Sequence, residues 1–532
     1  MTSISSLSTA QPLIIASAAV SVPVAGSPSV AAAVTSSPSS IVILGQDTSV
    51  VDAQTYNARG VIADPEVAPA WEYTRQDKVS LAMMGNFSSS SGSSRFQGLG
   101  ASLLAQLAET NKGISQSVIR SSTGKALEPA QLSAAQAKLH SSAADNSISL
   151  TLKTASGKTV QLTLSSQDNG LAVQADVSGG ELTDDELAAL GKMADGFQSA
   201  IDGLTARPPQ LKLDALTQFD AKAFSSVDLS TRFKLDDDST QTLELHADAD
   251  QRSVRMNGAA GDLNMSVDLR NAAVLGDSNQ QAKALKGYIS QIEAARKRGD
   301  GDPQLLSMFE DAFTTLHSHY PDTRAASAPQ TVNSIELTDT DHSLLTGLAD
   351  FSASVTEKTT ASNPARLNEL DSFAYDLSQA TQSKGHDQLN RTIVQDQQSH
   401  LTANYHKPLY AGQKLDLGRD AKSQNYLYYQ INDQASSKTS IGYDKGALVN
   451  ATVAQSASQS TRISRYVMGH LEDDKTTPVK SSKTQNLLGA LHQALQQDKE
   501  ASQGRGSSRL KQTLAGLQAK VLLQSDPARL NG

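Results

Sequence analysis

The C-terminal half of the chain carries a group of residues whose types suit metal binding or general-base catalysis. They are His386, Asp387, His400 and His406, with Tyr405 and Tyr410 close by in the sequence. An imidazole nitrogen can bind zinc or accept a proton near neutral pH, and a carboxylate can orient the ring by accepting a hydrogen bond. Such a site needs two or three histidines that face the same way. The alternative is that they lie at the surface and at strand edges.

Tyrosines form the second group with chemical potential. Seven of the twelve lie between residues 388 and 470, and five of these define a candidate binding patch: Tyr426, Tyr428, Tyr429, Tyr443 and Tyr466. Each tyrosine offers a flat apolar face and a polar tip, which suits a platform for a sugar or a peptide. The alternative is that they fill strands, where aromatic residues are favoured.

Other motifs fail at residues that their chemistry requires. Gly157-Lys158-Thr159 resembles the end of a phosphate-binding loop, but Leu152 stands where that loop needs glycine. Gly98-Leu99-Gly100 resembles the start of a dinucleotide-binding fingerprint, but Leu103 replaces its third glycine. We therefore expect no cofactor and no metal, and we identify no catalytic motif.

Hydrophobic periodicity predicts an α+β protein with two antiparallel β-meander modules and amphipathic helices. Residues 98–270 show a β-meander, a helix and a second β-meander. The helix opens with a capping box at Thr183 and Glu186. Residues 271–385 read as a helical segment with an αα-hairpin and a later helix from Asn363 to Leu377. A Tyr-rich antiparallel β module is expected over 386–480, and amphipathic helices over 481–532.

Residues 1–97 have a composition typical of a disordered tail. They are dominated by Ser, Ala, Thr, Val and Pro, which bury too little apolar surface to offset the entropy of ordering. Val67 to Met84, with Trp71 and Tyr73, interrupts this composition. We interpret that stretch as an anchor onto the first module, with a docking motif as the alternative.

Composition also limits the classes of function. The net charge of −9 disfavours nucleic-acid binding, and the absence of cysteine excludes disulfides and thiolate chemistry. No apolar run is long enough for a membrane-spanning helix. The Ser-rich first 95 residues, which carry no charged side chain before Asp47, and the lack of cysteine resemble bacterial substrates of type III and flagellar-type export. Unlike flagellar filament proteins, the chain has no long N-terminal heptad helix.

Two classes of function remain open. The first is a non-enzymatic interaction or structural protein with a protein partner, located in the cytoplasm or exported by a signal-peptide-independent route, with the cytoplasm preferred. The second is an enzyme with a site built from His386, His400 and His406. Convergence of two imidazoles beside a carboxylate in a pocket would favour the enzyme.

Overall fold

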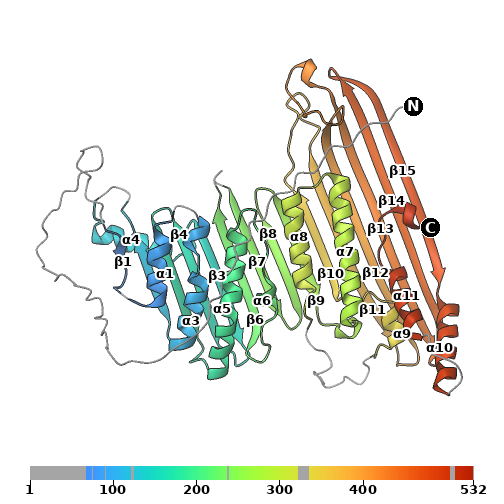
Figure 1. Cartoon of the computed structure of the whole chain (residues 1–532), viewed down its shortest axis with the longest axis horizontal. Helices are drawn as coiled ribbons and strands as arrows, with labels where there is room; N and C mark the ends of the chain where they lie inside the picture. Colours follow the sequence, from blue (N-terminus) through green and yellow to red (C-terminus); the bar gives the residue numbers. More distant parts are fainter. Residues whose placement is uncertain are drawn as a thin grey trace, which may run out of the picture. The chain divides into compact units, whose positions relative to one another are not determined.

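One antiparallel sheet organises the part of the chain that the structure describes. The computed structural model describes residues 68–74, 76–89, 92–121, 125–235, 239–320, 335–503 and 510–530. Fifteen strands lie in the order β1-β2-β5-β4-β3-β6, followed by β7 to β15 in sequence order (Figure 1). The strands are β1 (Ala70–Trp71), β2 (Ile114–Ile119), β3 (Asn146–Thr154), β4 (Thr159–Gln167), β5 (Gly170–Ser178), β6 (Phe224–Lys234), β7 (Thr240–Asp248), β8 (Gln251–Asn257), β9 (Gly261–Asp268), β10 (Asp350–Glu357), β11 (Ser372–Gly385), β12 (Arg391–Pro408), β13 (Tyr426–Asp444), β14 (Ala447–Val467) and β15 (His470–Asn486).

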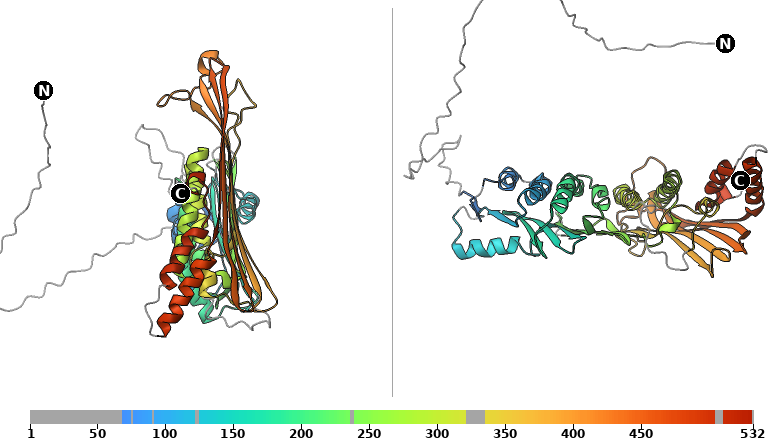
Figure 2. Two further views of the ribbon diagram at one scale, coloured as in Figure 1. Left: turned by 90° about the vertical axis from the view of Figure 1, so that its right-hand side faces the viewer. Right: turned by 90° about the horizontal axis from the view of Figure 1, so that it is seen from below.

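Helices cover mainly one face of this sheet, which we call the helical face. Figure 2 shows α1, α3, α5, α7, α8, α10 and α11 on this side and α4 on the other. The opposite side of β6–β15, which no helix of the described residues covers, is the open face. The helices are α1 (Lys78–Phe87), α2 (Gly92–Arg95), α3 (Leu99–Thr110), α4 (Pro129–Leu139), α5 (Asp184–Thr205), α6 (Asp214–Thr217), α7 (Ser278–Gly299), α8 (Pro303–Leu316), α9 (Asp339–Ser343), α10 (Leu488–Ser502), α11 (Leu510–Val521) and α12 (Pro527–Leu530).

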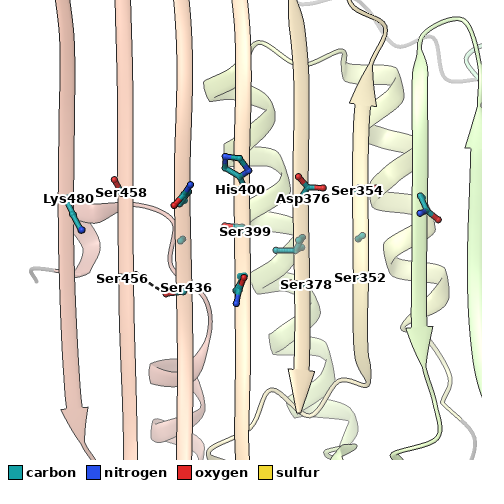
Figure 3. Close-up of a pocket in the computed structure, with 16 residues that line it drawn as sticks. Ser352, Ser354, Asp376, Ser378, Ser399, His400, Ser436, Ser456, Ser458 and Lys480 are labelled. Carbon is teal, nitrogen blue, oxygen red and sulfur yellow. Dashed lines mark hydrogen bonds between the residues drawn. The ribbon is translucent and has the colours of Figure 1, made fainter. Parts of the chain in front are cut away.

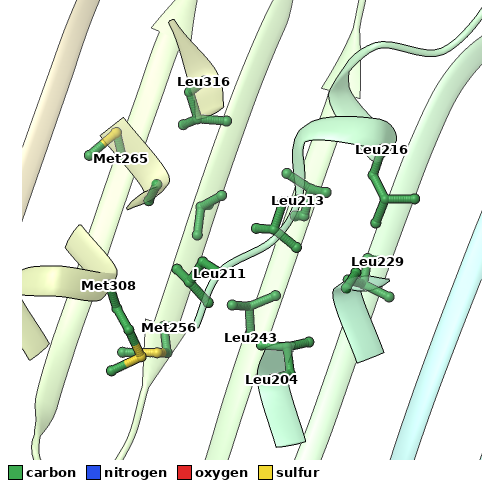
Figure 4. Packing of buried hydrophobic residues seen from close by; sticks show 14 of the residues in the cluster. Leu204, Leu211, Leu213, Leu216, Leu229, Leu243, Met256, Met265, Met308 and Leu316 are labelled. Carbon is green, nitrogen blue, oxygen red and sulfur yellow. The ribbon is translucent and has the colours of Figure 1, made fainter. Parts of the chain in front are cut away.

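The α+β fold class is confirmed, and several predicted elements appear where the periodicity placed them. Helix α5 has the predicted capping box, in which the side chains of Thr183 and Glu186 each accept from the other residue's backbone N–H. Helices α7 and α8 form the predicted αα-hairpin, with Asp302 capping α8. Apolar residues of α5, of the 211–216 segment and of α8 pack onto alternating residues of β6–β9 (Figure 4). The strands expected in two modules share one sheet, because β9 pairs with β10 along eight residues.

Two predictions were wrong in part. The helix expected from Asn363 to Leu377 is absent, since residues 372–385 form β11. Leu367 and Leu370, which suggested a helical stripe, are exposed, while Phe373, Tyr375 and Leu377 alternate as buried strand residues. Residues 373–377 therefore follow the two-residue alternation of a strand and not the 3.6-residue period of a helix. The region predicted to be helical over 271–385 consequently contains β10 and β11 as well as α7, α8 and α9.

Ordered structure also begins earlier in the chain than predicted. Residues 1–67 lie outside the described residues, but 70–71 form β1, paired with β2, and 78–87 form α1. Val79, Met83 and Phe87 of α1 are buried in the main core. Helix α1 forms and packs on the core because Asp77 caps its N-terminus and a short apolar stripe follows this cap. Trp71 packs partly buried against the same core, as expected of an anchor.

The edge strand β15 carries features that oppose pairing with another sheet. It is 17 residues long, and most of its side chains are exposed. Lys475, Lys480, Lys483 and Pro478 lie along it. Charged side chains and proline on an edge strand disfavour strand addition.

Of the helices in the described ranges, none combines the length and apolarity that crossing a membrane requires.

Candidate functional site

The three candidate histidines lie at separate places along β11 and β12. His386 is in the turn between these strands, where its backbone N–H donates to the carbonyl of Asn390. Asp387 caps the same turn by accepting from the backbone of Leu389 and Asn390. His400 and His406 are both in β12, and six residues of strand separate them by about 20 Å. Within the described ranges, no group of three or more His, Cys, Asp or Glu side chains could hold a metal.

His406 lies in a buried ionic cluster on the open side of β12. Its Nδ1 donates to Asp371 at 2.6 Å, and its Nε2 donates to Glu369 at 3.2 Å. Glu369 also accepts a hydrogen bond from the hydroxyl of Tyr426 at 2.6 Å. Burial alone would lower the pKa of His406, but the bonds to Asp371 and Glu369 raise it to about 9. The imidazole is therefore charged at neutral pH and balanced by two carboxylates.

Three of the five candidate tyrosines join this cluster. Tyr426, Tyr428 and Tyr466 are buried together, because Tyr428 is paired with His406 across β12–β13 and Tyr426 with Tyr466 across β13–β14. The loop before β11 covers them, with the Tyr428 hydroxyl donating to the carbonyl of Leu370. We call His406, Glu369, Asp371 and these three tyrosines the tyrosine cluster.

The other two tyrosines lie on the helical face. Tyr429 stacks on Tyr405, whose hydroxyl donates to the carbonyl of Arg298 in α7. Tyr443 lies near the opposite end of β13, where its hydroxyl donates to Asp341 at 2.7 Å. The structure thus divides the predicted patch among three places.

The tyrosine cluster has the contacts of a structural element. Both ring nitrogens of His406 are engaged, and its side chain has no exposed surface. A general base needs a free nitrogen within reach of a substrate proton. The cluster instead attaches the loop containing Glu369 and Asp371 to the end of the open face.

Beyond this cluster, the open face of β9–β15 is lined by small polar side chains. One row crosses seven paired strands in register: Asn264, Ser354, Asp376, His400, Gln434, Ser458 and Lys480. A neighbouring row contains Ser352, Ser378, Gln398, Ser436 and Ser456. We call these two rows the polar rows (Figure 3).

A pocket of about 720 Å³ lies over the polar rows and is lined by them. Six of its residues are open-face serines, two of which, Ser436 and Ser456, hydrogen-bond across β13–β14 at 2.9 Å. The Nε2 of His400 lies 3.2 Å from the side-chain oxygen of Asn432, which accepts, and 3.3 Å from the hydroxyl of Thr402. The rows contain one carboxylate, one lysine and one histidine, so the pocket has almost no net charge. Such a surface suits hydrogen bonding to a neutral polar partner.

The polar rows were not predicted from the sequence, although each strand carries the signal. Polar residues alternate with buried ones in β12, β13 and β14, as in Gln398 and His400 or Ser456 and Ser458. Alternation shows that one face is polar, but the register between strands decides which residues become neighbours. The register was not predictable from any single strand.

Comparison with protein-family models, with curated proteins and with solved structures finds no match to this chain. Its function must therefore be inferred from its own residues.

Proposed function

We propose that this chain is a non-enzymatic binding protein whose polar rows contact a protein partner. The observation that carries the proposal is the 720 Å³ pocket built by seven adjacent strands on a face that no helix of the described residues covers. Serine has little intrinsic preference for strands, and a strand position exposed to solvent would be more stable with threonine or valine. The six open-face serines of the pocket instead leave room for close approach by a partner's atoms and supply hydroxyl donors and acceptors.

The chemistry of the pocket favours a protein over other polymers. Nucleic acid would require a cluster of Lys and Arg to neutralise phosphates, and Lys480 is the sole such residue among those lining the pocket. Among the same lining residues there is no Phe, Tyr or Trp on which a sugar ring could stack. Amide and hydroxyl side chains match the polar groups of a protein surface. Export without a cleaved signal stays a prediction of the N-terminal composition.

Two arginines placed in the pocket test this proposal. The double variant Ser378→Arg/Ser456→Arg fills the polar rows with bulky charge, so we expect the captured amount of its partner to fall at least about tenfold. Its thermal unfolding should stay close to that of the wild type, because surface changes usually alter stability by about 0.5 kcal/mol or less. Immobilised chains are exposed to an extract of the native host, and captured proteins are quantified by mass spectrometry.

Ser230→Arg is the matched control. Ser230 is exposed on β6 on the same open face but outside the pocket. Proteins held by the wild type and by Ser230→Arg, and lost with the double variant, would support the proposal. An unchanged set of captured proteins with the double variant would refute it.

A further inference from the structure

A cavity of about 240 Å³ lies on the helical face, between α7, strands β11 to β14 and the segment that follows α11. Helix α7 contributes two small side chains to its lining, Ala294 and Ala295, at positions where larger residues would fill the space. The polar rows are on the opposite side of the sheet. A role for this cavity is therefore independent of the function proposed for them.

The sheet brings a buried hydroxyl group without a partner to this cavity. Tyr375 of β11 lines the cavity and is 2% exposed, and its hydroxyl makes no hydrogen bond of good geometry within the described residues. Ser399 of β12, which is 7% exposed, is the polar side chain beside it. Burial raises the pKa of Tyr375 and the nearby Ser399 opposes this shift, so the hydroxyl keeps its proton at neutral pH. A buried hydroxyl without a partner favours an occupant that can hydrogen-bond to it.

Two glutamines add further hydrogen-bonding groups to the lining. The backbone N–H of Ser525 donates to the side-chain carbonyl of Gln291 at 3.1 Å, and the side-chain NH2 of Gln459 donates to the carbonyl of Ser525 at 3.2 Å. The other ends of these amides, an NH2 on Gln291 and a carbonyl on Gln459, make no hydrogen bond to another described residue. The lining therefore offers donors and acceptors together.

The charged residues of the lining are balanced within the chain. Arg298 of α7 donates two hydrogen bonds to Asp433 of β13, one of them at 2.9 Å, and Asp433 also accepts from the backbone N–H of Ser460 at 3.1 Å. Asp526, whose side chain is 46% exposed, pairs with Arg529 at 3.7 Å. A ligand with a carboxylate or an ammonium group finds no unpaired charge here, so the lining favours a neutral ligand.

The size of the cavity limits its ligand to a few carbon atoms. Pockets for drug-sized ligands usually measure about 300–1,000 Å³. At about 30 Å³ for each water-sized group, a cavity of about 240 Å³ accommodates about eight such groups. The apolar part of the lining, which is Ala294, Ala295 and Leu401, suits the C–H groups of a small molecule.

We propose that this cavity binds a small neutral polyol, whose hydroxyl groups hydrogen-bond to Tyr375, Gln291 and Gln459. Each hydroxyl of a polyol both donates and accepts, which matches a lining that offers donors and acceptors and has no unpaired charge. The carbon chain of the polyol lies against the two alanines of α7.

Erythritol, a neutral four-carbon polyol, is the probe for this site. Saturation-transfer NMR with the full-length chain is expected to show binding that saturates as the erythritol concentration rises. Tyr375→Phe removes one hydroxyl from the lining, so we expect it to weaken erythritol binding at least about fivefold. Because this hydroxyl makes no hydrogen bond of good geometry in the folded chain, Tyr375→Phe should not lower the midpoint of thermal unfolding measured without erythritol. A hydroxyl with a structural role would lower that midpoint when removed.

Ala294→Phe tests the location of the site. Ala294 is exposed and lines the cavity, so a phenyl ring at this position should block entry and abolish saturable binding. Tyr429→Phe is the matched control, since Tyr429 lies on the helical face outside the cavity, and it should bind erythritol as the wild type does. The zwitterion L-serine, which is similar in size to erythritol, should bind at least about tenfold more weakly.

Three results would overturn the proposal. The first is the absence of saturable erythritol binding to the wild type. The second is equal binding to the wild type and to Tyr375→Phe or Ala294→Phe. The third is binding of L-serine as tight as that of erythritol.

Discussion

Replacing Asp341 with alanine is expected to lower the free energy of unfolding by about 3–5 kcal/mol, as measured by urea denaturation. Asp341 and Arg391 form an ion pair at 2.8 Å, and their side chains are 0% and 3% exposed. Arg391 also lies over the ring of Tyr443, 3.8 Å from its centroid. Without Asp341, a buried guanidinium keeps its charge and loses its counter-ion.

The same substitution removes three further hydrogen bonds. Asp341 accepts from the hydroxyl of Tyr443 and from the side chain and backbone of Thr338, which caps α9. The double variant Asp341→Ala/Arg391→Leu removes the stranded charge, so it should be less destabilised than Asp341→Ala alone. The account is contradicted if the free energy of unfolding of Asp341→Ala lies within 1 kcal/mol of the wild-type value, or if the double variant is less stable than Asp341→Ala. In either case the buried pair does not hold α9 to β12 and β13.

Replacing His406 is expected to have the second large effect on the free energy of unfolding, and this effect depends on pH. Its pKa of about 9 in the folded chain exceeds its ordinary value of 6.5, so the cluster stabilises the folded chain by about 3 kcal/mol. A raised folded pKa means that this contribution is complete below pH 6.5 and is lost as the pH rises through 9. His406→Gln should therefore be much less stable than the wild type at pH 6 and nearly equal to it at pH 10.5.

The difference between the two proteins is the quantity to measure, by urea denaturation across pH 6–10.5. Groups outside the tyrosine cluster are the same in both proteins, so their contributions cancel in the difference. A gap in stability that stays constant over this range would show that the folded chain does not raise the pKa of His406. Tyr429→Phe is a matched control, since Tyr429 lies on the helical face and outside the tyrosine cluster.

Local elements could be predicted where one period dominates the sequence. Helix α5, the α7–α8 hairpin and the meanders follow from apolar spacing and from caps such as Thr183 and Asp302. The union of the two β regions could not be predicted, because β9 and β10 are separated by about 80 residues that include a helical hairpin. Such long-range pairing depends on contacts that local periodicity does not encode.

The candidate residues were predictable in type and not in position. Alternation places Tyr426 and Tyr428 on one face of a strand, but their meeting with His406 depends on strand register. Glu369 and Asp371 come from a loop in which the apolar spacing predicts a helix. The buried glutamines of the helical face, such as Gln397 and Gln455, could not be predicted, because buried glutamines in a helix-covered sheet depart from the usual apolar pattern.

Photo-crosslinking from the pocket in the native host tests the proposed function most directly. A photoreactive phenylalanine analogue at position 378 lies within the polar rows, and the same analogue at position 230 lies on the open face outside them. We expect a covalent adduct with a partner protein from position 378 and none from position 230. Adducts from 230 without any from 378, or no adduct from either position, would contradict a binding role for the polar rows.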